Sequence, residues 1–392
     1  MYEKRGGHVK SAKSLPYKWH KYIDWIEILM SKNFENSDQI IIYGYDEKEM
    51  EDAAQRFKRL GFLNIKLYKE FVKEWSANES LPMNKLERYN HLVSARWLNT
   101  LIATGIAPEY SSDNFVICHA HYQNLKDYEL GHISKALPLD TNALESTETW
   151  NRRSPEELKK EFEEMGITSD TTVILYGRFS YPKNEDQFPG SSAGHLGAMR
   201  CAFIMLYAGV KDVRILNGGL QSWIDAGYKL TKEEFKPNPV KDFGVTIPAH
   251  PEYVVDVPEA KEMLQSPQAN LVCVRSWAEY IGEVSGYNYI VKKGRIPGAV
   301  FGNCGSDAYH MENYRNLDHT MREYHEIAQL WEEVGITPDK HNAFYCGTGW
   351  RGSEAFMNAW LMGWPKISVF DGGWFEWSND DSNPIETGYP NK

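Results

Sequence analysis

The sequence predicts an α/β fold in which similar units, each a parallel sheet flanked by helices, follow one another along the chain. The first observation is an internal repeat: residues 163–168 (EEMGIT) recur as residues 332–337 (EEVGIT), and each copy leads into a short apolar segment. The second is an alternation of strand-like segments of about five residues with helical patterns, which is typical of parallel βαβ units with right-handed crossovers.

The two copies agree element by element. In each, a central strand is followed by a helix of small and apolar residues, a short strand and a Gly-Gly turn. The matching segments are 173–177 and 343–346 for the strand, 218–219 and 372–373 for the turn, and 131–138 and 294–300 for an upstream loop. This alignment puts Gly177 of the earlier copy in the place of Cys346 of the later one.

A weaker copy opens the chain. It contains Gly7-His8-Val9, a strand at 40–44, a helix at 49–60 and a strand at 65–68, and Gly44 stands where the cysteine would be. No obvious first strand precedes these elements, so we expect a degenerate unit, and truncation is one way to read it.

The copies predict three domains, covering residues 1–90, 91–235 and 250–392. A helix at 92–101 is expected to open the second, and the proline-containing segment 236–240 to form the linker before the third. The first two domains have no cysteine at the key position, so we expect them to contribute shape, stability or a wall of the active-site cleft. Catalysis is expected in the third alone.

Composition excludes several functional classes. The 43 basic and 54 acidic residues give a net charge of −11, which argues against nucleic acid or an anionic membrane as partner. No apolar run approaches the length that a membrane span needs. The five cysteines include no Cys-x-x-Cys pair, so neither a disulfide framework nor a metal site is expected. We predict a soluble, cytoplasmic protein.

One cysteine has the setting of a nucleophile. Cys346 directly follows an apolar strand and is followed by Gly347, Gly349 and a helical run at 353–362. Peptide N–H groups of such a loop and of the helix N-terminus favour a thiolate. The alternative is a buried structural cysteine, which is the expected role of the cysteines in strand-like or helical runs, namely Cys118, Cys201 and Cys273. Cys304 lies in a loop-like segment, and its role stays open.

The spacing of the loop points to sulfur chemistry. Cys346 and Arg351 bracket four residues, whereas cysteine phosphatases use a longer loop to hold a phosphate. Together with the segments 294–300, 271–275 and 369–374, this loop resembles the rhodanese-like sulfurtransferases. The resemblance implies tandem rhodanese domains, no cofactor and a persulfide on the cysteine. The loop residues expected to hold the persulfide are Gly347, Thr348, Gly349, Trp350 and Arg351.

The loop sequence Cys-Gly-Thr-Gly-Trp-Arg narrows the resemblance. It is similar to that of the anaerobic ergothioneine synthases within this family, which transfer sulfur from polysulfide to the imidazole C2 of hercynine, the trimethylbetaine of histidine. The resemblance therefore implies polysulfide as donor and a small cationic or zwitterionic acceptor such as hercynine. A homodimer stays open as an assembly.

An aromatic and acidic loop before residue 294 is expected to border the cysteine, because its counterpart in two-domain sulfurtransferases binds substrate. Tyr287 is the candidate proton carrier. Trp277, Glu279 and Tyr280 offer aromatic faces and a carboxylate to a trimethylammonium, and Arg275 offers a bidentate grip on a carboxylate. Each has a structural alternative: a core position for Trp277, a structural acid as partner for Arg275, and exposure to water for Glu279.

Two other functional classes remain open. One is a general thiosulfate or polysulfide sulfurtransferase that passes sulfur to cyanide, a thiol or a carrier protein. The other is a regulatory or scaffolding rhodanese module that binds partners, and the complete loop at Cys346 argues against it for the third domain.

Overall fold

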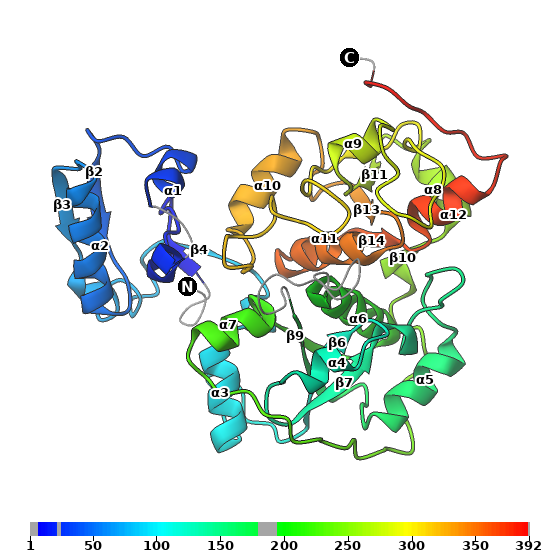
Figure 1. The fold of residues 1–392 in the computed structure, drawn as a ribbon, viewed down its shortest axis with the longest axis horizontal. Helices are drawn as coiled ribbons and strands as arrows, with labels where there is room; N and C mark the ends of the chain where they lie inside the picture. The colour runs from blue at the N-terminus through cyan, green and yellow to red at the C-terminus, as the bar shows by residue number, and fades with distance from the viewer. Residues whose placement is uncertain (1–6, 22–24, 179–193, 391–392) are drawn as a thin grey trace. The chain divides into compact units, whose positions relative to one another are not determined.

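The computed structural model describes residues 7–21, 25–178 and 194–390, and the chain divides into two compact units, residues 1–86 and 87–392 (Figure 1). Within the described residues, no helix has the length and apolar character needed to cross a membrane.

The described residues of the first unit form a parallel βαβ motif. Strands β2 (Gln39–Ile42) and β3 (Asn64–Leu67) pair in parallel, and the helix α2 (Glu47–Arg59) connects them along the chain. The strands and helix predicted here are found close to their expected positions. Gly7-His8-Val9 forms a strand, β1 (Gly7–Val9), that pairs antiparallel with β4 (Met83–Lys85). The remaining helices are η1 (Tyr17–Lys21), α1 (Trp25–Ser31) and η2 (Lys69–Phe71).

The second unit contains two five-stranded parallel sheets with the same strand order. The orders are β5-β9-β8-β6-β7 and β10-β14-β13-β11-β12, so each strand of one sheet has a counterpart in the other. The strands of the first are β5 (Leu92–Val93), β6 (Phe115–His121), β7 (Ala136–Asp140), β8 (Thr172–Gly177) and β9 (Asp212–Leu216). Those of the second are β10 (Val254–Val255), β11 (Ala269–Cys273), β12 (Val300–Phe301), β13 (His341–Tyr345) and β14 (Ile367–Phe370).

Helices cover both faces of these sheets, which explains why the central strands read as continuous apolar runs. Around the first sheet they are η3 (Tyr89–His91), α3 (Ala95–Thr104), α4 (Lys126–Glu129), η4 (Thr141–Ala143), α5 (Pro155–Glu164), α6 (Gly194–Ala208) and α7 (Gly219–Asp225). Around the second they are η7 (Pro251–Tyr253), α8 (Val257–Met263), α9 (Trp277–Tyr280), α10 (Tyr324–Glu332), α11 (Trp350–Leu361) and α12 (Gly373–Asn379).

The helices α6 and α11 lie side by side where the two sheets' domains meet (Figure 1). Every residue of α6 is buried, because this helix has its own sheet on one side and the neighbouring domain on the other. Phe203 of α6 contacts Phe356 of α11 edge to face, with ring centroids 5.1 Å apart. The helix that follows the Cys346 loop is therefore packed on the domain that has Gly177 in the place of this cysteine.

The helix predicted at 92–101 begins later than expected. Leu92 and Val93 form β5, and the helix α3 starts at Ala95 because the Ser94 side chain accepts a hydrogen bond from the Trp97 N–H and caps it. The glycines of the two repeated Gly-Ile-Thr segments have the same structural role, which is to end the helix before them. Gly166 and Gly335 follow the helices α5 and α10 with φ of 76° and 78°, a left-handed conformation that glycine adopts at little cost.

Candidate active site

Cys346 follows the last residue of β13, and α11 begins four residues later at Trp350. The helix is capped by Gly349, whose φ of 93° requires glycine. The N-terminal end of α12 fixes the start of the loop: the Trp374 and Phe375 N–H groups donate to the carbonyls of Cys346 and Gly347, at 2.9 Å each. Cys346 is 1% exposed, so the thiol lies in a site largely closed to water.

Tyr287 lies directly against this loop, as predicted. Its hydroxyl oxygen accepts hydrogen bonds from the Gly347 N–H at 3.3 Å and from Nη2 of Arg351 at 2.6 Å. A Cβ on Gly347 would lie 2.3 Å from the Tyr287 ring, so this close approach requires glycine. Burial raises the pKa of Tyr287 well above its ordinary value, against the opposing charge of Arg351. The phenol is therefore neutral at physiological pH and keeps an O–H that can donate a hydrogen bond.

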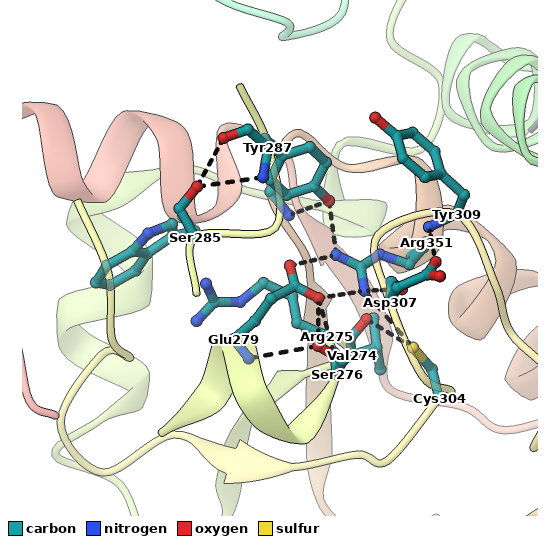
Figure 2. Close-up of polar contacts among 12 residues, drawn as sticks. Val274, Arg275, Ser276, Glu279, Ser285, Tyr287, Cys304, Asp307, Tyr309 and Arg351 are labelled. Atoms are coloured by element: carbon teal, nitrogen blue, oxygen red, sulfur yellow. Dashed lines mark hydrogen bonds and ion pairs between the residues drawn. The ribbon is translucent and has the colours of Figure 1, made fainter. Parts of the chain in front are cut away.

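Arg351 is the centre of a buried polar network (Figure 2). Its Nη2 and Nη1 contact the two carboxylate oxygens of Glu279 at 2.8 and 3.0 Å, and Nη1 also donates to the Asp307 carbonyl at 2.9 Å. Burial alone would raise the pKa of Glu279, but the charge and hydrogen bonds of Arg351 outweigh it and hold the pKa below its ordinary value. Figure 2 shows the guanidinium between the Glu279 carboxylate and the Tyr287 hydroxyl.

Glu279 is thus not exposed to water, the alternative that the sequence left open. It is 0% exposed, and besides binding Arg351 it caps α9 by accepting from the N–H and hydroxyl of Ser276. Its carboxylate contributes to the site by holding the arginine of the loop.

Three of the predicted substrate residues have other partners in the structure. Arg275 is 0% exposed, and its Nε and Nη2 lie 3.2 Å from the Cys273 sulfur and 2.6 Å from the Gly294 carbonyl. Trp277 stacks on Tyr280, and the Tyr280 hydroxyl donates to the carbonyl of residue 299 at 2.7 Å within the core. These contacts support structural roles for Arg275 and Tyr280 in place of the predicted contacts with a substrate, because both side chains are buried against protein groups. Trp277 is 39% exposed, so it does not have the core position that was its structural alternative.

The other cysteines are buried away from water. Cys118, Cys201 and Cys273 are 0% exposed in strands or helices, as expected for core residues. Cys304 is also 0% exposed, although it lies in a loop, and its thiol donates to the Val274 carbonyl at 3.1 Å. Burial raises the pKa of Cys304 to about 12, which keeps this thiol protonated.

The sequence did not identify the contacts that the second domain makes with the loop. Nε1 of Trp350 donates to Glu145, with 2.8 and 3.1 Å to the two carboxylate oxygens. Tyr122 contacts Trp350 edge to face at 5.6 Å, and in the neighbouring loop before residue 294, Tyr289 stacks on Trp150 of the second domain at 5.2 Å. The sequence signal for these contacts is Trp350, because an indole N–H in a buried loop needs a hydrogen-bond acceptor from elsewhere in the protein.

Comparison with known proteins agrees with this geometry. The model of the rhodanese-like domain matches residues 2–78, 122–226 and 256–380. The thiosulfate sulfurtransferase YnjE of Escherichia coli is 40% identical over 388 residues, covering 97% of this chain and 84% of that protein.

Solved structures give a still closer match. The anaerobic ergothioneine biosynthesis enzyme of Chlorobium limicola, in complex with trimethyl histidine, is 60% identical with a TM-score of 0.94, over 98% of this chain and 91% of that chain. A tyrosine-to-phenylalanine variant of EanB has been solved with a cysteine persulfide and ergothioneine in a tetrahedral intermediate state. It is 58% identical with a TM-score of 0.95, and the match covers 100% of this chain and 95% of that chain. EanB variants of a threonine and of cysteines have been solved with hercynine. The chain belongs to the rhodanese-like family and is a sulfurtransferase.

Proposed function

We propose that this protein takes a sulfane sulfur from polysulfide onto Cys346 and transfers it to the imidazole C2 of hercynine, which gives ergothioneine. The observation that carries the proposal is the Tyr287 hydroxyl, which is bonded to the Gly347 N–H next to Cys346 and to Arg351. A phenol at this position is what transfer to a carbon atom needs and what transfer to cyanide or a thiol does not.

The solved EanB structures support the assignment of individual residues. In EanB the persulfide cysteine, the substituted tyrosine and the substituted threonine stand at the same separations along the chain as Cys346, Tyr287 and Thr348. The two cysteines replaced by alanine in a hercynine complex likewise match Cys273 and Cys304. At 58–61% identity over almost the whole chain, these matches favour the same substrate and the same residue roles.

The first step loads the cysteine. The Cys346 thiolate attacks a sulfane sulfur of polysulfide; one S–S bond forms, one breaks, and a polysulfide shorter by one sulfur leaves. Gly347, Thr348, Gly349 and Trp350 contribute the loop and the helix start, whose N–H groups would stabilise the persulfide anion.

The second step forms the carbon–sulfur bond. The outer sulfur bonds to C2 of the imidazole, the S–S bond breaks, and its electron pair returns to the Cys346 sulfur as thiolate. The proton that leaves C2 is taken up by the Cys346 thiolate freed in this step, and the sulfane sulfur accepts the two electrons, so no external oxidant is required. With two N–H donors on its oxygen, the Tyr287 hydroxyl is set to direct its own proton at the reacting groups.

Mass spectrometry tests the proposal directly. After treatment with polysulfide, the Cys346 peptide should carry one or more added sulfurs, and hercynine should remove them as ergothioneine appears. The Cys346→Ala variant should gain no sulfur at this peptide. If the loaded protein gives no ergothioneine but converts cyanide with thiosulfate, the acceptor assignment is wrong and the general sulfurtransferase is correct.

A further inference from the structure

A chain of four ion-paired charges joins the second domain to the Cys346 loop; three are fully buried, and the fourth, Arg152, is 18% exposed. Glu145 and Arg200 form an ion pair at 3.0 Å, with both side chains 0% exposed. Arg200 also forms an ion pair with Asp371 at 2.6 Å, and Asp371 forms one with Arg152 at 2.9 Å. Asp371 belongs to the third domain and the other three to the second. Arg152 also pairs with Asp256 at 3.1 Å, so opposite charges alternate along the network and offset the cost of burial. Burial nevertheless raises the pKa of Glu145 to about 7, against the opposing charge of Arg200.

One end of this network holds the end of the loop. Glu145 accepts the Trp350 N–H with both carboxylate oxygens, at 2.8 and 3.1 Å. The indole ring lies on α6 at Gly197, where an added Cβ would be 3.6 Å from two ring atoms. Arg200 approaches the loop backbone as well, because a Cβ on Gly349 would lie 2.9 Å from its Nη1.

The other end holds the beginning of the loop. Both the backbone N–H and Nη1 of Arg152 donate to Asp371, at 2.9 Å each. Asp371 is followed by the turn whose next N–H groups, those of Trp374 and Phe375, bind the carbonyls of Cys346 and Gly347. The network therefore contacts the structure around the loop on both sides of the thiol.

We propose that Glu145 and Arg200, from the domain that has Gly177 in place of the nucleophile, are positioning residues for the Cys346 loop. They hold Trp350 and the turn at Asp371, and through them the backbone that surrounds the Cys346 sulfur. The proposal rests on the proposed function, because it assumes that Cys346 carries the sulfur. It gives the second domain a defined part in the reaction, since loop amides stabilise an anion only when they are fixed in place beforehand.

The test compares Glu145→Ala with Trp350→Phe, which keeps an aromatic ring but removes the N–H. The readout is the single-turnover rate at which polysulfide forms the persulfide on Cys346, measured by mass spectrometry of quenched samples. We expect each variant to slow persulfide formation roughly 10- to 100-fold. The double variant should be no slower than either single variant, because both changes remove the same contact between Trp350 and Glu145. Glu145→Gln, which keeps an acceptor for the indole, should recover most of the rate.

Asp127→Asn is the matched control. Asp127 forms an ion pair with Arg178 at 2.6 Å in the same domain, and their side chains are 4% and 7% exposed. Its loss should lower the melting temperature and leave the rate of persulfide formation unchanged. Parent-like rates in Glu145→Ala and Trp350→Phe, or effects that multiply in the double variant, overturn the proposal. If Glu145→Ala does not fold, Trp350→Phe and Glu145→Gln decide. Because this readout needs no hercynine, a failure of the acceptor assignment is seen separately, in the parent protein.

Discussion

Replacing Tyr287 by phenylalanine separates the loading of sulfur from its transfer. The change keeps the ring against Gly347 and deletes the oxygen that accepts from Gly347 and Arg351. Arg351 keeps its two contacts with Glu279, so the free energy of unfolding should fall by only ~1 kcal/mol. Persulfide formation at Cys346 should continue normally, because the polysulfide reaction needs no proton from the phenol.

Transfer to hercynine should fall by roughly 10²-fold or more, which corresponds to about 2.7 kcal/mol in the activation free energy. The assay loads each protein with polysulfide, removes the excess, adds hercynine and follows ergothioneine by chromatography and mass spectrometry in a single turnover.

Tyr280→Phe is the control, since it deletes a buried hydroxyl that donates to a backbone carbonyl away from the cysteine. A Tyr287→Phe variant that transfers sulfur at the parent rate would show that Tyr287 is structural.

Three further predictions follow from the same contacts. Cys346→Ser should abolish persulfide formation and turnover; if Cys304→Ala abolishes them as completely, the assignment of a single nucleophile is wrong. Glu279→Gln removes a buried partner of Arg351 and should lower the free energy of unfolding by about 3 kcal/mol at neutral pH. Because the folded-state pKa of Glu279 is lowered, its contribution is complete above the ordinary value of about 4.3 and is lost as the pH falls through the folded-state value. The free energies of unfolding of the two proteins, measured in urea from neutral pH downward, should therefore converge as the pH falls, and a constant difference would contradict this origin. Gly177→Cys should create no second persulfide and should lower stability by ~3 kcal/mol, because a Cβ there would lie 2.2 Å from the first carbonyl of α6; peptide mapping that finds sulfur at this cysteine would refute the prediction.

The sequence predicted those parts of the structure that local patterns determine. The repeated segments gave the two equivalent sheets, because each βαβ unit repeats the same alternation of strand and helix. The loop at Cys346 could be predicted from its own strand–loop–helix pattern, whereas Tyr287 could be placed beside it through the resemblance to two-domain sulfurtransferases. In the structure Tyr287 lies in the loop that follows β11, the strand that pairs with β13. The start of α3 was missed because one capping side chain, Ser94, outweighed the helical pattern of the two residues before it.

The remainder depends on pairs of side chains that no periodicity relates. Glu145 and Trp350 are 205 residues apart, and neither residue type predicts the other. Arg275 stood at the end of a strand, where a substrate contact was reasonable. Only the packed structure shows that its guanidinium binds the Cys273 sulfur and the Gly294 carbonyl instead.

Comparison of the two equivalent domains shows which features the chemistry requires. The third domain pairs Glu279 of α9 with Arg351, and the second pairs Asp127 of α4 with Arg178, so each has a buried acid–arginine pair beside its central strand. This pair therefore belongs to the fold and does not by itself make a site.

The difference lies at the carboxyl end of the central strand. In the third domain a thiol and a glycine loop in contact with the Tyr287 ring follow the strand, whereas in the second the backbone at the start of α6 fills the space beside Gly177. The same helix α6 carries Arg200 and packs against α11. The helix α6 thus fills the space beside Gly177 in the second domain and also supports the Cys346 loop of the third domain. Restoring a thiol at Gly177 would require moving the element on which the active loop depends.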